Sequence, residues 1–228
     1  MSNDNKPVTA IGRRDVLKNG AAFTAAVAAL SAAPAAVAAL SAAPAAVRAA
    51  TKRPPNIVYI LVDDLGWADL GYRGSDIRTP NIDKLAKTGR DLAEFYAQPM
   101  CTPTRAAIMT GRYPLRYGLQ MGVIPSGASY GLALDEQTLP QLLKRGGYTT
   151  ALVGKWHLGH GDQAYWPLQR GFDSTYGPLI GEIDHFKHTS HGVNDWFRGN
   201  APLVEPGYDT DLFGNEAVRI IDGHDRAN

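Results

Sequence analysis

The sequence has 228 residues, a formal net charge of +1 and a single cysteine. Residues 51–228 carry 18 basic and 20 acidic residues, a net charge of −2. This balance argues against a nucleic-acid-binding surface, which normally shows a strong basic excess. One cysteine cannot form an intramolecular disulfide, so no disulfide framework holds this fold.

The first 50 residues differ in composition from the rest. Residues 19–50 are almost entirely small and apolar, and segment 12–18 (GRRDVLK) resembles a twin-arginine export signal. We therefore predict that residues 1–50 are a twin-arginine signal peptide with an Ala-rich leader, and that the product is periplasmic or secreted. Pro34 and Pro44 interrupt the apolar run, so we expect no stable membrane insertion; a membrane anchor is the alternative.

Strand and helix patterns alternate through the rest of the chain, residues 51–228. Strands are predicted from β-branched and apolar runs, and helices from Thr-Pro starts and Gly ends. Such alternation predicts a doubly wound α/β sheet, in which ligands bind at the carboxyl ends of the strands. The predicted elements are a strand over 56–62, a helix over 79–87, a strand over 91–97, a helix from Thr102 that Gly111 ends, a helix over 138–144, a strand over 148–153 and a helix over 208–222.

Adjacent carboxylates follow the first predicted strand, at Asp63 and Asp64. Such a pair suits a hard divalent cation, because Ca²⁺ and Mg²⁺ prefer oxygen ligands. The alternative is an Asx-type turn, since aspartate is common where strands end.

The single cysteine, Cys101, is predicted just before the helix that begins at Thr102. Unpaired backbone N–H groups at a helix start favour an anion, and Arg105 lies one helical turn further on the same side. A buried, inert thiol is the alternative. Pro99, Pro103 and the polar neighbours are a poor context for a core residue.

Lys155 and His157 follow the strand over 148–153. Residues two apart in an extended segment face the same side, so both side chains can point into one site. The ammonium group would hold an oxyanion, and the imidazole could hydrogen-bond a nucleophile or protonate a leaving group. A solvated lysine and a surface histidine are the alternative.

Three further histidines recur at three-residue spacing, His185, His188 and His191. Three imidazoles can bind zinc or copper, but no cysteine or strand supports such a site here. We expect a mobile, solvated loop.

Three strings resemble the type I sulfatases, formylglycine-dependent enzymes. They are Cys-Thr-Pro-Thr-Arg at 101–105 with Thr-Gly-Arg at 110–112, Asp-Asp-Leu-Gly-Trp at 63–67, and Gly-Lys-Trp-His-Leu-Gly at 154–159. The resemblance covers residues 56–222, is closest to the arylsulfatase B-like branch, and corresponds to the N-terminal part of the family's catalytic domain.

The resemblance implies an alkaline-phosphatase-like mixed sheet flanked by helices, truncated before the C-terminal part. It implies that a formylglycine-generating enzyme oxidises Cys101 to an aldehyde, whose hydrate attacks the sulfur of an aryl or carbohydrate sulfate. Arg105, Lys155 and His157 would be catalytic, and Asp63, Asp64 and residue 101 would bind Ca²⁺ in preference to Mg²⁺.

The sequence departs from the family pattern in what it lacks. The family's later Asp-Asn metal pair, second lysine, second histidine and C-terminal subdomain have no counterpart. We therefore expect this chain, by itself, to be inactive. Two alternatives stay open: a phosphate or phosphonate ester hydrolase of the same superfamily, and a non-catalytic exported remnant.

Overall fold

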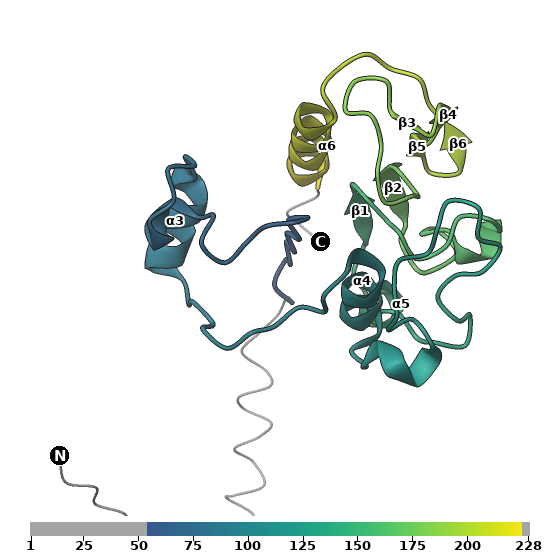
Figure 1. The fold of residues 1–228 in the computed structure, drawn as a ribbon, viewed down its shortest axis with the longest axis horizontal. Coiled ribbons are helices and arrows are strands. Elements are labelled where there is room, and N and C mark those ends of the chain that lie inside the picture. Colours follow the sequence, from purple (N-terminus) through teal and green to yellow (C-terminus); the bar gives the residue numbers. More distant parts are fainter. Residues whose placement is uncertain (1–53, 225–228) are drawn as a thin grey trace, which may run out of the picture. The chain divides into compact units, whose positions relative to one another are not determined.

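The helices and strands of the described residues lie in one unit of the chain, residues 60–227 (Figure 1). The computed structural model describes residues 54–224, so the predicted signal peptide and leader, 1–50, lie outside the described residues. Within the described part, no helix combines the length and the hydrophobicity that a membrane span requires.

The main sheet is mixed and has four strands in the order β1-β2-β5-β6. The first pair in this order, at one edge of the sheet, is parallel, with Ala151 opposite Ser174, and the other two pairs are antiparallel. The strands are β1 (Ala151–Val153), β2 (Ser174–Gly177), β5 (Phe197–Arg198) and β6 (Ala201–Pro202), and a separate hairpin pairs β3 (Thr189–Ser190) with β4 (Val193–Asn194).

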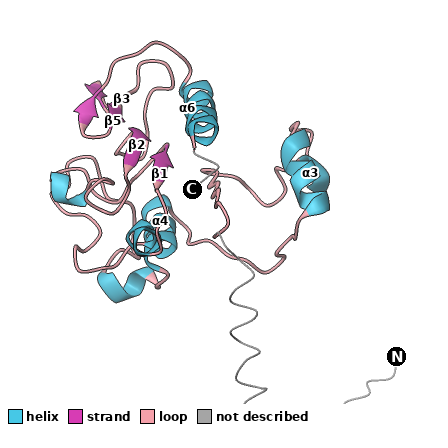
Figure 2. Cartoon of the chain, turned by 180° about the vertical axis from the view of Figure 1, so that it is seen from behind, coloured by secondary structure: helices cyan, strands magenta, loops and turns pink. Residues whose placement is uncertain are grey.

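Within residues 54–224, four α-helices accompany the sheet, and each one matches a helix predicted from the sequence. They are α3 (Pro80–Thr88), α4 (Cys101–Thr110), α5 (Leu139–Arg145) and α6 (Asp209–Gly223). In the view from behind, α6 lies beside β1 and β2 (Figure 2), and these elements are in contact. The mixed sheet with flanking helices is the predicted arrangement.

The start of α4 differs from the prediction by one residue. Met100 is the N-cap, with an extended backbone, so Cys101 is the first residue of the helix and does not precede it. Gly111 ends the helix as predicted, with a left-handed backbone (φ of 65°) that favours glycine.

The strands predicted over 56–62 and 91–97 are wrong, and β1 is shorter than the predicted 148–153. A strand in the middle of a sheet needs hydrogen-bonding neighbours on both edges. Neither run pairs with a strand among residues 54–224, and their apolar side chains are exposed: Ile60 is 76% and Tyr96 is 82% accessible. The apolar pattern shows what a segment can bury, but not whether a neighbour is present.

The hydrophobic core joins α4 to the segment that follows β1. Ala106 of α4 packs with Leu132, Trp156 and Leu158, all at most 2% exposed. The indole of Trp156 meets the ring of Phe172 edge-on at 6.1 Å. This core fixes the N-terminus of α4 against residues 155–157, where the candidate site lies.

Candidate active site

Side chains from three segments that are distant in the sequence meet at the N-terminus of α4. Lys155 Nζ lies 2.5 Å from Asp63 Oδ2 and 3.2 Å from Cys101 Sγ. Cys101 Sγ in turn lies 3.4 Å from Asp63 Oδ1. The predicted convergence of these segments is present in the structure.

Arg105 reaches the same group of side chains from one turn along α4. Its Nη2 lies 3.8 Å from Asp63 Oδ1, and its Nη1 donates a hydrogen bond of 2.5 Å to the backbone oxygen of Lys155. Burial lowers the pKa of Arg105, although Asp63 and Cys101 oppose this. The guanidinium of Arg105 is thus partly buried, and its Nη2 atom faces the carboxylate of Asp63.

Asp63 is a carboxylate among two cations. Partial burial raises its pKa, but the hydrogen bond and charge of Lys155, together with Arg105, outweigh this and leave the pKa below 3.8. Asp63 is therefore ionised at neutral pH. Its neighbour Asp64 has a left-handed backbone with a φ of 53°.

One oxygen of each aspartate and the sulfur of Cys101 lie within 4.8 Å of one another. Among residues 54–224 this is the one group of three acidic, histidine or cysteine side chains close enough to share a cation. The two carboxylates suit Ca²⁺ or Mg²⁺, whereas a thiol is a soft ligand that these cations disfavour. The donor set thus fits a hard cation at two of its three positions.

The imidazole of His157 is directed elsewhere. The backbone at His157 is left-handed, with a φ of 60°, so the extended segment that the prediction assumed is not present there. Its Nε2 lies 3.1 Å from the Ile124 oxygen, and the residue is only 5% exposed. Burial, aided by the charge of Lys155, lowers the pKa of His157 to about 4. A catalytic role for His157 remains a prediction.

Two residues around this site, Thr102 and Gly181, were given no role by the sequence-based prediction. Thr102 is fully buried and bonded to His157 and Ile124, while Gly181 lies against the His157 ring. Thr102 could have been suspected, because it stands inside the cysteine motif. No sequence signal marks Gly181, because its role depends on how closely the His157 ring approaches its backbone.

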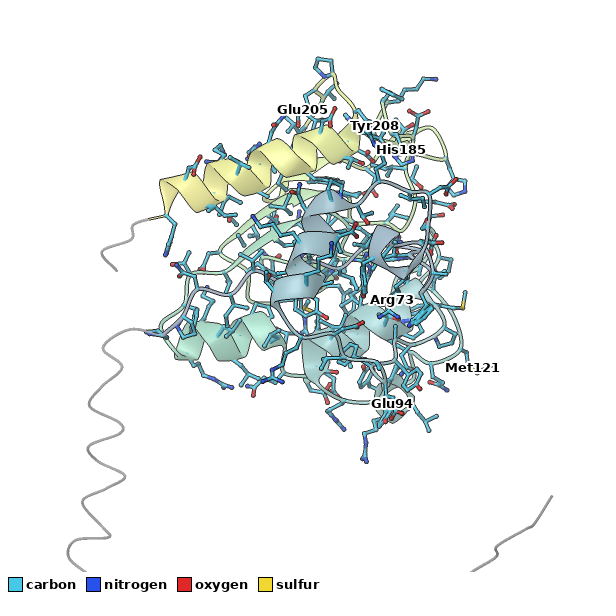
Figure 3. All side chains as sticks on the ribbon, turned by 90° about the vertical axis from the view of Figure 1, so that its left-hand side faces the viewer. Arg73, Glu94, Met121, His185, Glu205 and Tyr208 are labelled. Carbon is cyan, nitrogen blue, oxygen red and sulfur yellow. The ribbon has the colours of Figure 1, made fainter. Side chains whose placement is uncertain are left out.

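The three spaced histidines do not form one group. His185 Nδ1 lies 2.9 Å from Asp209 Oδ2, and His185 lies beside Tyr208 in Figure 3 with their rings 5.6 Å apart. His188 is 1% exposed and stacks on Trp196 at 4.3 Å. The predicted solvated loop is therefore wrong for His188, because the ring finds an aromatic partner.

The chain belongs to the sulfatase family, whose model (Sulfatase) matches residues 55–227. Mouse arylsulfatase J is 45% identical over 184 residues, which is 75% of this chain and 30% of arylsulfatase J. Of the solved structures, Ps i-CgsB matches with a TM-score of 0.69 and 37% identity, covering 75% of this chain and 42% of that chain.

A third relative was solved with a ligand. BT4656, in complex with its substrate D-glucosamine-2-N,6-O-disulfate, matches with a TM-score of 0.60 and 29% identity, covering 77% of this chain and 32% of that chain. The chain thus spans less than half the length of each of these relatives. These matches establish the predicted family and its fold.

Proposed function

We propose that this chain supplies the nucleophile and part of the metal site of a sulfuric ester hydrolase. In this proposal Cys101 is the precursor of a formylglycine, and its hydrate attacks the sulfur of a sulfate ester. The observation that carries the proposal is the meeting of Cys101, Asp63 and Lys155 within 3.4 Å, in a chain of the sulfatase family.

A divalent cation, Ca²⁺ in preference to Mg²⁺, would be held by Asp63, Asp64 and the side chain at position 101. When bound, it would offset negative charge on the sulfate oxygens and on the nucleophile. Conversion of the thiol to an aldehyde hydrate would replace a soft sulfur by a hard oxygen, and would complete a ligand set suited to such a cation.

The two basic side chains would orient the ester. Lys155 Nζ lies within 3.2 Å of both Asp63 and Cys101, so it can donate to a sulfate oxygen placed against residue 101. Arg105 holds Lys155 through its backbone oxygen and presents a second positive charge. Two fixed cations beside the nucleophile suit a substrate with a tetrahedral anionic group.

Sulfated carbohydrates are the substrate class that we propose, with export through the twin-arginine pathway placing the enzyme where such polymers occur. The substrate of BT4656, a sulfated glucosamine, supports this choice. We also propose that the chain alone is inactive, because two carboxylates and one further ligand are fewer than the six to eight oxygens that Ca²⁺ takes.

Mass spectrometry of the tryptic peptide 91–105 tests the proposal. The chain would be co-expressed with a formylglycine-generating enzyme and treated with iodoacetamide, which alkylates a thiol but not an aldehyde. We expect a peptide about 18 Da lighter than the thiol form, because sulfur is replaced by oxygen and two hydrogens are lost. A fully alkylated peptide after co-expression would contradict the proposal.

A further inference from the structure

Thr102, the residue after the cysteine, closes a ring of hydrogen bonds among three segments. Its hydroxyl donates to the His157 backbone oxygen at 3.0 Å and accepts from the Ile124 backbone N–H at 3.1 Å. The His157 ring completes the circuit, with Nε2 at 3.1 Å from the Ile124 oxygen. One threonine thus ties the N-terminus of α4 to two other segments.

All three members of this ring are shielded from solvent. Thr102, Ile124 and His157 are 0%, 1% and 5% exposed, respectively. Polar groups at such depth need partners, because an unsatisfied buried donor or acceptor is costly. The Thr102 hydroxyl is therefore the partner that satisfies both the His157 oxygen and the Ile124 N–H.

A second bond links the same two segments on the side that faces the candidate site. Arg105 Nη1 donates to the Lys155 oxygen, and Thr102 Oγ1 donates to the His157 oxygen. Helix α4 therefore holds the 155–157 segment at two points, two residues apart. Lys155 Nζ and Cys101 Sγ, 3.2 Å apart, project from the two segments joined in this way.

We infer that Thr102 is a positioning residue: its buried hydroxyl sets the distance between the side chain at position 101 and the ammonium group of Lys155. This inference rests on the proposed function, which makes residue 101 the nucleophile. It goes beyond that function by assigning a role to the residue of the cysteine motif that neither binds the cation nor contacts the ester.

The alkylation chemistry of the unmodified thiol tests this role. The full chain, with its thiol form verified by mass, would be treated with iodoacetate and with iodoacetamide. The ratio of the two rates reports local charge, because only iodoacetate is anionic and is favoured by a nearby cation. Lys155→Gln should lower this ratio and serves as the reference for loss of the ammonium group.

Thr102→Val removes the hydroxyl at nearly constant shape. We expect it to lower the iodoacetate-to-iodoacetamide ratio by about threefold or more, as expected when a unit charge moves away from the thiol. Thr102→Ser keeps the hydroxyl and should restore the ratio. Thr110→Val is the matched control, because Thr110 lies at the other end of α4 and its hydroxyl bonds to the Ala106 oxygen; it should leave the ratio unchanged.

The accessibility of the thiol cancels in the ratio, because both reagents attack the same thiol, and the ratio is compared only between variants that are folded under the reaction conditions. If Thr102→Val does not fold, as judged by circular dichroism, Thr102→Ala takes its place, since its smaller side chain leaves room for a water molecule. A folded variant without the hydroxyl that keeps the wild-type ratio would overturn the inference. Since the thiol itself is measured, failure here is distinct from failure of aldehyde formation in peptide 91–105.

Discussion

At the scale of single residues, the two adjacent aspartates of the candidate site differ in their ion pairs. Asp63 has two basic neighbours, Lys155 and Arg105, and it stays ionised with a pKa below its usual value. Asp64 lies next to this group without an ion pair to a basic side chain within residues 54–224. The two aspartates therefore differ in environment: Asp63 is paired with basic side chains, and Asp64 is not.

Gly181 provides a test of how tightly the His157 ring is held. A Cβ atom added at Gly181 would lie 2.1 Å from His157 Cε1, so the ring or the backbone must move. We expect Gly181→Ala to lower the free energy of unfolding by about 1–3 kcal/mol, the usual cost of overpacking. Urea denaturation measures this change in the free energy of unfolding. Gly127→Ala is the control, because nothing lies within 4 Å of its added Cβ, and an equal effect at both glycines would contradict the packing.

The lowered pKa of His157 predicts how stability depends on pH. Above pH 6.5, His157 is neutral in both the folded and the unfolded state. Between pH 6.5 and about 4, only the unfolded chain takes up the proton. The free energy of unfolding therefore falls as the pH drops through this range. The loss attributable to His157 should reach about 3 kcal/mol. It is measured as the difference in free energy of unfolding between wild type and His157→Gln across this range. A difference that does not vary with pH would contradict a buried neutral ring.

At the scale of secondary structure elements, a buried carboxylate on α6 bonds to the sheet. Glu216 accepts hydrogen bonds from Arg198 of β5 at 2.7 Å and from Arg219 of its own helix at 2.6 Å. The hydrogen bond from Arg219 outweighs burial and, together with Arg198, lowers the pKa of Glu216 to about 2. Its contribution to stability is present above pH 4.5 and is lost as the pH falls toward 2.

Glu216→Gln should therefore loosen α6 first. We expect a loss of about 1.5–3 kcal/mol, the range for hydrogen bonds to charged groups, seen as faster amide hydrogen exchange over residues 209–223 at pH 7. Asp222→Asn is the control, because Asp222 is an exposed acidic residue on the same helix. Equal exchange rates in both variants would argue that the Arg198 contact does not hold the helix.

Helices were predictable from local signals, whereas of the three predicted strands only the one over 148–153 is present, as the shorter β1. Helix α3 begins after Thr79, with Pro80 in its first turn, and ends before Gly89, as predicted. Such signals are readable from sequence because caps and breakers act within a few residues. The run over 56–62 has a strong strand pattern, yet a strand also needs a partner that the pattern does not specify. Of the site, the sequence predicted the meeting of residues 63, 101 and 155, although the strand expected before Asp63 is absent from residues 54–224.

The parts of the site that the sequence did not predict depend on three-dimensional closeness. The hydroxyl of Thr102 meets a backbone oxygen 55 residues away, and Gly181 is required only because the His157 ring occupies the space beside it. The left-handed backbone at His157 likewise redirects a ring that simple alternation placed beside Lys155. Such features follow from how segments pack, which no local pattern records.

At the scale of the whole molecule, the buried residues are confined to the later part of the described chain. No residue of 54–100 is fully buried, whereas the hydrophobic core draws on residues 106–179. Large apolar side chains such as Trp67 and Phe95, both 71% exposed, lie on the surface. Segments with few buried contacts open locally at low free energy.

Limited proteolysis should follow this division. We expect chymotrypsin to cleave after Trp67, Phe95 or Tyr96 well before it cleaves after Trp156 or Trp196, which are at most 2% exposed. Cleavage sites are read by mass spectrometry at early times, with urea-unfolded chain as the control for intrinsic preference. First cleavage at Trp196 would contradict the assignment of the core.

The central claim concerns residue 101 as the nucleophile, and the rate of sulfate ester hydrolysis tests it directly. Residues 55–227 would replace the matching part of arylsulfatase J, and the hybrid would be assayed with 4-nitrophenyl sulfate after co-expression with a formylglycine-generating enzyme. We predict that the hybrid turns over the ester and that Cys101→Ala lowers the rate at least about 1,000-fold, while Thr110→Val does not. A folded Cys101→Ala hybrid that hydrolyses the ester as fast as its parent would contradict the account.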